Sequence, residues 1–499
     1  MPTKKTSSKR SKVDKAAAPA KAVAGAVVAA WEDDPGDPKT LPALTPITVQ
    51  APKINAKPLP FRMGGPTPPP KIFQAGTSNF RFYAAAVALR RTADFWGAIV
   101  PPSTKWQVGN TLPVVLDDGV DLNAFYTRGG FGDAPGLHFF HDTVGGRTLF
   151  SGESPDVACH EMGHAFLDAI RPQLFDVASV EAAAFHESFG DMTAILSNLQ
   201  IPSFRQSVFN ETQGRINRAS RLSRLAEQLG AAIRVQHPDA VDRDCLRNAA
   251  NSFFYRDPQT IPPFGPASQL SSEPHSFSRV FTAAFLDVLA GIFSLQRSSP
   301  ASDDLVSASR DAGRILVAGI LAAPVVPDYY SQVAAHMIEA GDAAPFNGKY
   351  RNALRSAFVR RGILSLQASA TVSSVSRSRA TAMPTAPAAR GLVELPKASI
   401  SGALFGLTSM VLSVHTAEAP KRFGVTSSSL TLGPVEPSSP QTAAESFAED
   451  LFQRGRVDAG ALTKSEAALV HPLPTKTHVI TQENGDLVLK RRTFDCGFD

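Results

Sequence analysis

The stretch SPDVACHEMGHAFLDAI, residues 154–170, carries His160, Glu161 and His164 in the order His-Glu-x-x-His. Its apolar residues recur at helical spacing, which predicts a helix over 156–170. Positions i and i+4 lie on one face of a helix, so both imidazoles can be directed at one metal ion. Glu161 lies about 100° further round the helix, where it can act on a water molecule beside the ion without binding the ion itself. Two unrelated histidines on an ordinary helix are the alternative interpretation.

A third metal ligand is offered by the next apolar stretch, VEAAAFHESFGDMTAIL, which predicts a helix over 179–199. Glu187 and Asp191 are again four residues apart, so they share one face. Two acids on an apolar helix are costly to bury without a cation or hydrogen-bond partners. Glu187 is therefore assigned as the ligand, and Asp191 as the residue that orients a ligand imidazole. His186 and Glu181 are rival ligands on other faces of the same helix.

The composition, 43% hydrophobic and 19% charged over 499 residues, is typical of a globular protein with two or three domains. Residues 1–72 combine a lysine-rich arm with eleven prolines between residues 32 and 71, which predicts a disordered basic tail and a stiff linker. Residues 73–365 are predicted to form the main domain. A Ser/Ala/Pro-rich linker over 366–395 and a small β-rich module over 396–499 are expected to follow it.

Short apolar runs separated by Gly and Asp predict strands before residue 155, and mostly helices are predicted after it. An α+β fold, with a sheet-containing N-terminal part followed by a helical part, is therefore expected. Further helices are expected at 78–100, 217–234, 276–296, 303–322, 328–340 and 349–361. In the C-terminal module we expect one helix in QTAAESFAEDLFQRG, and a hairpin that turns at Asn484 and Gly485.

Taken together, the two helices resemble those of the thermolysin-like (gluzincin) zinc metallopeptidases, in which H-E-x-x-H is followed by E-x-x-x-D on the next helix. The resemblance covers roughly residues 75–365. NAFY, residues 123–126, is similar to the edge strand that lies along the substrate in that family. EPHSFSRVF places His275 at the start of a helix, and CLRNAA places Arg247 28 residues before it. Both resemble family motifs and occur in the family's order.

The resemblance implies a two-lobe catalytic domain and a zinc-dependent endopeptidase that uses a metal-activated water. Zinc would be bound by His160, His164 and Glu187, with Asp191 behind them. Glu161 would be the general base, and His275 would stabilise the tetrahedral intermediate. The peptide substrate would lie extended along Asn123 and the Ala124 backbone, with Arg247 on one of its carbonyl groups.

Two residues depart from the pattern of the family. Leu270 stands where the family has an aspartate that orients the counterpart of His275, and Glu273 is the substitute in this sequence. The tyrosine that shares the oxyanion role falls at Phe175. Tyr126 and Tyr255 are the alternatives for that role. These departures bear on how active the site is.

Other ligands and locations are weakly indicated. Asn198 stands at a calcium-ligand position of the family and no acidic cluster follows Asp191, so a calcium site has no visible ligand set. The basic arm could bind nucleic acid, but no basic and aromatic residues alternate elsewhere in the chain. No uninterrupted apolar run is long enough for a membrane span. The segment AVAGAVVAAW, residues 22–31, lacks leucine and a clear cleavage site, so a cytoplasmic location is favoured over secretion.

A peptidase fold that lacks activity and serves as a binding module is the alternative function. The unligated glutamate at position 161 argues against it, because a purely structural metal site has no need of that residue. The oligomeric state and the natural substrate have no signature in the sequence.

Overall fold

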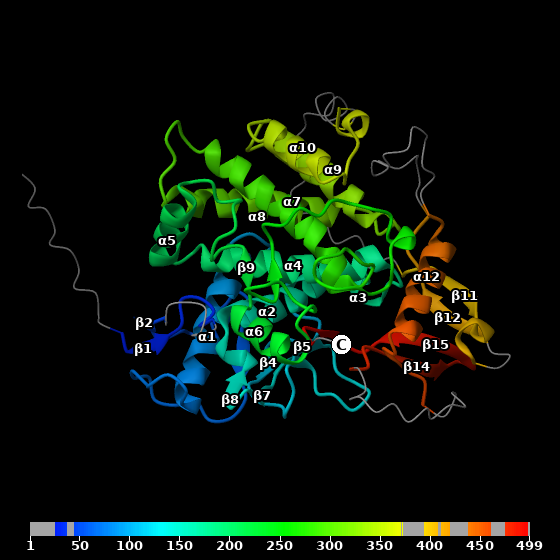
Figure 1. Cartoon of the computed structure of the whole chain (residues 1–499), viewed down its shortest axis with the longest axis horizontal. Helices are drawn as coiled ribbons and strands as arrows, with labels where there is room; N and C mark the ends of the chain where they lie inside the picture. Colours follow the sequence, from blue (N-terminus) through cyan, green and yellow to red (C-terminus); the bar gives the residue numbers. More distant parts are fainter. Residues whose placement is uncertain are drawn as a thin grey trace, which may run out of the picture.

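The structure, a computed structural model, describes residues 25–36, 44–370, 372, 394–407, 411–419, 438–460 and 475–497. It is a mixed helix and sheet structure, as the α+β prediction requires. In Figure 1 the strands of the main sheet lie on one side, helices α7–α10 lie on the other, and α2 and α4 run between them. The C-terminal sheet and its helix lie at one end of the molecule.

The main sheet has the strand order β16-β5-β6-β4-β3. Strands β3, β4 and β6 run parallel to one another, β5 is antiparallel to β6, and β16 is antiparallel to β5. The last strand comes from the far end of the described chain and covers what is otherwise the free edge of β5. The bounds are β3 Phe61–Met63, β4 Leu112–Val115, β5 Ala124–Thr127, β6 Gly136–Phe139 and β16 Phe494–Asp495; the hairpin β7 His141–Val144 and β8 Arg147–Phe150 follows β6.

Helices α2 and α4 form the centre of the molecule. Nearly every residue of both is buried, because α1 and the main sheet cover α2 while α7 covers α4. Ser154 begins α2 by accepting a hydrogen bond from the backbone N–H of Val157, and Pro155 occupies the first helical position. Ser179 caps α4 in the same way through the N–H of Ala182. The helices are α1 Ser78–Gly97, α2 Pro155–Ile170, α3 Gln173–Asp176, α4 Val180–Asn198, α5 Pro202–Thr212, α6 Glu227–Gln236, α7 Pro274–Ser294, α8 Asp304–Ala322, α9 Tyr329–Asp342 and α10 Arg351–Arg360.

The helix predictions are confirmed to within a few residues, with two exceptions. The helix predicted over 217–234 is wrong in its first half, since a short strand β9 (Arg224–Leu225) pairs there with β10 (Arg247–Asn248) and α6 begins only at Glu227. Helix α5 was not predicted. It is a mostly polar helix that buries only a few side chains, so its hydrophobic periodicity is weak.

The prediction of a disordered segment over 1–72 is wrong for the part that the structure describes. Residues 1–24, which hold most of the basic arm, and residues 37–43 lie outside the described residues. Strands β1 (Val27–Ala30) and β2 (Ile47–Gln50) form an antiparallel hairpin, and β3 enters the main sheet. Asp33 is buried and pairs with Arg221 at 3.0 Å. Short strands between prolines are stabilised here by distant partners, which leave no local pattern in the sequence.

The β-rich C-terminal module contains a five-stranded sheet of order β11-β12-β15-β14-β13 and helix α12 (Pro440–Gln453). The hairpin prediction is confirmed, with Asn484 and Gly485 both at positive φ between β14 and β15. The strands are β11 Lys397–Ser401, β12 Val411–His415, β13 Val457–Asp458, β14 His478–Glu483 and β15 Asp486–Arg491. Of the predicted linker, residues 371 and 373–393 lie outside the described residues, and residues 366–370 are helical.

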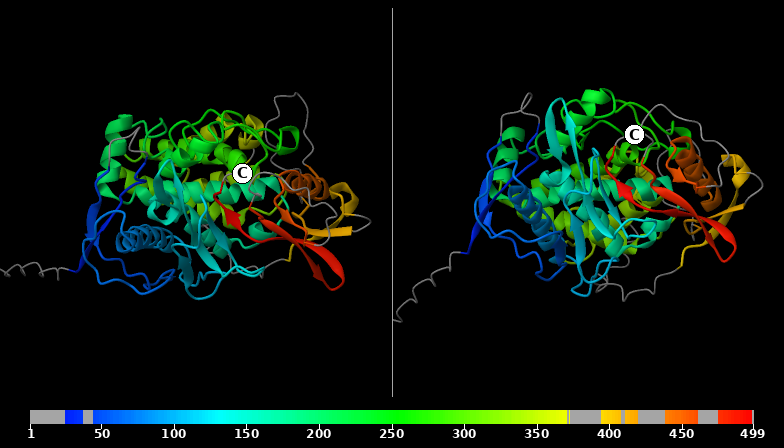
Figure 2. Two further views of the ribbon diagram at one scale, coloured as in Figure 1. Left: turned by 60° about the horizontal axis from the view of Figure 1, so that its bottom comes forward. Right: turned by 90° about the horizontal axis from the view of Figure 1, so that it is seen from below.

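The C-terminal module is not a separate appendage. The backbone N–H of Ala178 donates to the carbonyl of His415 at 2.8 Å, and the Ser272 hydroxyl donates to Asp450 at 2.6 Å. Beyond β15 the chain crosses to the main sheet and forms β16, as the red ribbon in Figure 2 shows. The module therefore contributes residues to the centre of the protein, which the sequence did not indicate.

Among the described helices, α7 is the one long and apolar enough to span a membrane by length and composition. Serines, an arginine and an aspartate interrupt its apolar residues, so the expectation that no uninterrupted apolar run reaches this length agrees with the structure. In the fold, 78% of its most apolar window is buried, mainly against α4, α8 and α10. That burial is typical of a core helix.

Candidate metal centre

Two glycines bring α2 and α4 close enough to share one site. A Cβ atom on Gly163 would lie 2.9 Å from the Cα of Gly190, so the two backbones touch at this crossing. A Cβ atom on Gly190 would lie 2.5–2.7 Å from atoms of the His160 ring, so the imidazole packs directly on the α4 backbone. The absence of two side chains thus lets acids on α4 reach histidines on α2.

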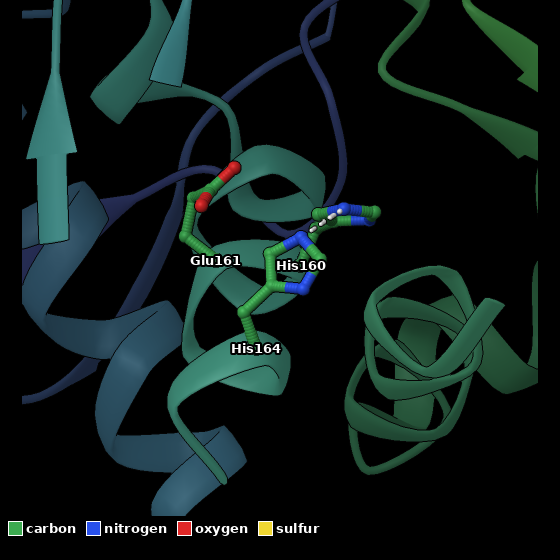
Figure 3. A group of neighbouring side chains, drawn as sticks. All are labelled: His160, Glu161 and His164. Atoms are coloured by element: carbon green, nitrogen blue, oxygen red, sulfur yellow. Dashed lines mark hydrogen bonds between the residues drawn. The ribbon is translucent and has the colours of Figure 1, made fainter. Parts of the chain in front are cut away.

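The predicted ligand atoms converge on one point. The Nε2 atoms of His160 and His164 lie 3.1 Å apart. The Glu187 carboxylate faces both, at 3.3 Å from Nε2 of His160 and 3.7 Å from Nε2 of His164. Figure 3 shows the two imidazoles side by side, with Glu161 extending next to them from the same helix. Two imidazoles and one carboxylate are donors that can bind a divalent metal ion.

The protonation chemistry of the cluster fits a cation. All three side chains are almost wholly buried, and Oε2 of Glu187 lies 3.3 Å from Nε2 of His160 and 3.2 Å from Nε2 of His275. Burial lowers the pKa of His164 well below its usual value. Burial also opposes charge on His160, yet hydrogen bonds to Asp191 and Glu187 raise its pKa to about 9. Without an ion, the positive charge favoured on His160 balances the carboxylates of Glu187 and Asp191. A divalent ion could supply that positive charge in its place, and His160 would then give up its proton to bind the ion.

Asp191 contacts His160 on the side of the ring away from Glu187 and His164. Its carboxylate lies 3.0 Å from Nδ1 of His160, which directs Nε2 of that ring at Glu187 and His164. Arg247 donates to both oxygens of the same carboxylate, at 2.9 and 3.1 Å. The Arg247 guanidinium and the His160 hydrogen bond outweigh burial and lower the pKa of Asp191, so it is ionised. The Nε–H and one Nη–H group of Arg247 are thus used by Asp191. Arg247 can donate to a substrate carbonyl only through its remaining N–H groups.

Glu161 lies within 4.8 Å of the ligand atoms of His160 and His164. Burial raises its pKa to about 8. Its Oε1 accepts a hydrogen bond from the Cys496 thiol at 2.9 Å, while its Oε2 has no hydrogen-bond partner within the described residues. Burial therefore favours the protonated carboxyl group at neutral pH; once ionised, its unsatisfied Oε2 can accept the proton of a water molecule held beside it.

His275 stands on the other side of Glu187, at 3.2 Å from its Oε2. Its Nδ1 lies 2.8 Å from Glu273, which also caps α7 through the N–H of Ser276. Glu273 therefore takes the orienting position that Leu270 cannot, and Leu270 packs against the hydrophobic core instead. These two carboxylates outweigh burial and raise the pKa of His275 to about 9, so it is a hydrogen-bond donor at neutral pH.

The predicted substrate edge, β5, is occupied by the chain itself. The Asn123 side chain is buried and accepts from the N–H of Ala124 at 2.8 Å. The Ala124 carbonyl accepts from the backbone N–H of Cys496 at 2.8 Å. Gly497 follows, and a Cβ atom there would lie 2.7 Å from Nδ2 of Asn123.

The alternatives left open by the sequence have different surroundings. Tyr126 donates to the buried Asp168 at 2.7 Å, and Tyr255 donates to Glu181 at 2.6 Å, so neither hydroxyl faces the cluster. Phe175 packs edge-on against Phe494. The rival ligand Glu181 is occupied by Tyr255 and by the N–H of Tyr330.

His186 and Cys159 also lie off the ligand cluster. Nδ1 of His186 faces Nδ1 of His164 at 3.3 Å, on the side away from Glu187. The Cys159 thiol lies among Thr92 and Ser197 in the core, as its position one residue before His160 predicts. Asn198 donates to Asp156 at 2.7 Å, in place of a calcium-binding carboxylate.

Replacing Glu181 with Gln tests whether this buried acid is structural. Burial raises its pKa to about 8, so the folded protein binds its proton more tightly than the unfolded chain does. Its contribution to stability is full below pH ~4.5 and is lost as the pH rises through about 8. We expect the wild type to lose roughly 3 kcal/mol more than Glu181→Gln between pH 5 and pH 8. Urea denaturation at both pH values measures this, and equal losses would contradict it.

The sequence missed Cys496 as a member of the site. It is separated from Glu161 by more than three hundred residues and lies in a stretch without a helix or strand motif of its own. An isolated cysteine carries no signal of a distant partner.

Comparisons with family models and with curated proteins found no match to this chain.

Proposed function

We propose that this protein is a zinc-dependent endopeptidase with a thermolysin-like two-lobe catalytic domain. The observation that carries the proposal is the convergence of His160, His164 and Glu187 beside a buried Glu161 that is not required as a ligand. A zinc ion held there would supply a Lewis acid for the scissile carbonyl and lower the pKa of a water molecule. The donor types and their burial fit such an ion.

The other residues of the cluster divide the work of peptide hydrolysis. Glu161 accepts the proton of the attacking water and passes it to the leaving amine. His275, held by Glu273, donates a hydrogen bond to the oxygen on which negative charge develops. The substrate pairs as an extended strand with β5, through the Ala124 backbone and beside Asn123.

A binding protein without activity is the competing proposal. A binding protein would need neither the unsatisfied oxygen of Glu161 nor the hydrogen bond between Glu273 and His275. An unsatisfied carboxylate oxygen is costly to maintain in the interior of a protein. Both are accounted for by a reaction that moves a proton and develops negative charge.

The test combines zinc content with hydrolysis of a quenched-fluorescence peptide library. We expect one zinc per chain in the wild type and in His141→Asn, a control at a partly exposed histidine outside the cluster, and none in His164→Asn. Because β16 covers the β5 edge, hydrolysis is measured in the wild type and in Gly497→Val, whose side chain would collide with Asn123. Chelator should stop the reaction and zinc should restore it. A zinc-loaded Gly497→Val protein that cleaves no peptide would refute the proposal.

A further inference from the structure

Residues 493–497 lie along β5 as an added antiparallel strand. Phe494 is paired with Tyr126, and Asp495 with Phe125. The Thr493 hydroxyl donates to the Tyr126 carbonyl at 2.9 Å, and the Cys496 N–H donates to the Ala124 carbonyl. A strand edge has one set of free backbone groups, so a peptide cannot pair there while this segment does.

Phe494 anchors the segment beside the metal cluster. Its ring is 2% exposed and stacks on His186 at 4.0 Å and on the ligand His164 at 5.0 Å between ring centres. The Arg491 guanidinium lies over the same ring at 4.0 Å. An aromatic side chain held by three such contacts is expected to seat the segment in one register.

Asp495 is held by both its backbone and its side chain. Its carbonyl oxygen lies 2.7 Å from Nε2 of His275, the nitrogen that the proposed reaction needs for a substrate carbonyl. Its carboxylate pairs with Arg456 at 3.0 Å, and both side chains are buried. The segment therefore occupies the oxyanion-stabilising donor as well as the edge strand.

Cys496 completes the occupation of the site. Its thiol is 3% exposed and donates to Oε1 of Glu161 at 2.9 Å. That oxygen is one of the two with which Glu161 would hold a water molecule. The thiol thus takes the position that the attacking water needs. The Asp495 carbonyl lies against His275 but is not hydrolysed, because no water can be held by Glu161 to attack it.

We propose that residues 493–497 are an intramolecular inhibitor that fills the substrate edge and closes the catalytic pocket with the Cys496 thiol. This rests on the proposed function. The segment is tethered, so its effective concentration at the edge is on the order of millimolar or higher, and a peptide at lower concentration competes poorly. Activity then requires that the segment leave β5.

The test uses Gly497→Val in the full zinc-loaded chain. The new side chain would meet the buried Asn123 and should displace the segment without altering a residue of the metal cluster. Gly265→Val is the matched control, because Gly265 is exposed and a Cβ atom there meets nothing closer than 3.9 Å. A chain that ends at Thr493 is a second release variant. Circular dichroism and zinc content check the folding of all three.

The first measurement is the rate at which N-ethylmaleimide labels Cys496 in the native protein, read by mass spectrometry. We expect it to be at least about 10-fold faster in Gly497→Val than in the wild type and Gly265→Val. Cys159 and Cys245, which are fully buried, serve as internal references in every sample. Labelling of Cys496 in the wild type that is as fast as in Gly497→Val and far faster than that of Cys159 and Cys245 would overturn the proposal, because the segment would not be seated.

The second measurement is hydrolysis of a quenched peptide, which should be at least about 10-fold faster in both release variants than in the wild type. Equal rates in active wild type and active variants would overturn the inhibitor. Loss of residues 496–499 from the wild type on incubation would also overturn it, in favour of self-cleavage after Asp495. Faster labelling without hydrolysis in any zinc-loaded chain would instead refute the peptidase function, and the inhibitory role with it.

Discussion

Replacing Glu161 with Gln in the Gly497→Val background is expected to lower peptide hydrolysis by about 10³-fold and to leave zinc content unchanged. Glutamine matches glutamate in shape and still accepts a hydrogen bond through its side-chain oxygen. It cannot take the proton of an attacking water at any pH of the assay. The loss should therefore appear in kcat, while KM changes little. Single-turnover hydrolysis measures the loss in rate, and metal analysis on the same preparation measures the zinc content.

The control for this prediction is Glu181→Gln in the same background. It makes the same substitution at another buried glutamate, which binds Tyr255 and the Tyr330 backbone and does not touch the metal cluster. We expect its kcat to stay within about 3-fold of the parent, the spread expected away from the reacting atoms. Peptidase activity in Glu161→Gln equal to that of Glu181→Gln would exclude Glu161 as the base.

Replacing Gly190 with Ala is expected to weaken zinc binding by about 100-fold and to destabilise the protein by roughly 2 kcal/mol. The added methyl group would lie 2.5–2.7 Å from three atoms of the His160 ring, which is held between α2 and α4. The ring must rotate or the helices must separate. Either change moves its Nε2 away from Glu187 and His164 and its Nδ1 away from Asp191. Competition with a chromophoric chelator measures the affinity.

Gly291→Ala is the control that distinguishes a loss of zinc affinity caused by moving His160 from a loss of stability caused by overpacking alone. Its Cβ atom would lie 2.6 Å from that of Ala353, at the packing of α7 against α10 and away from the cluster. We expect a comparable loss of stability, roughly 1–3 kcal/mol, with wild-type zinc affinity. Zinc bound by Gly190→Ala as tightly as by Gly291→Ala would show that the close contact with His160 does not position the metal ligand.

Local sequence patterns were sufficient to predict the two central helices and the grouping of the ligand atoms. His160 and His164 are one helical turn apart, and so are Glu187 and Asp191, so each pair shares a face wherever its helix is placed. The burial of two acids on α4 required a partner, and His160 and Arg247 are the partners that the structure provides for Asp191. The substitution of Glu273 for Leu270 was also foreseeable, because both residues lie just before the first residue of the same helix.

The N-terminal strands and the connection of the C-terminal module could not be read in this way. Strand β3 is three residues long and becomes a strand only through β4, about fifty residues later. Asp33 resembles any loop acid until Arg221 is placed beside it. Such pairings depend on where the chain returns in space, and proline density says only that regular structure cannot propagate locally.

The sequence by itself determined the helices α2 and α4 and the residues of the candidate metal site, because a helix repeats its faces every few residues and brings its own neighbours together. Only the tertiary structure decided how closely these helices approach, which carboxylate accepts the hydrogen bond from His275 and what lies on β5. Those features depend on the contact of Gly163 with Gly190, on Glu273 as a helix cap, and on Cys496 meeting Glu161 from the far end of the described chain. A strand pairing across that separation has no local signature, since its stabilisation arises from partners that the sequence does not place side by side.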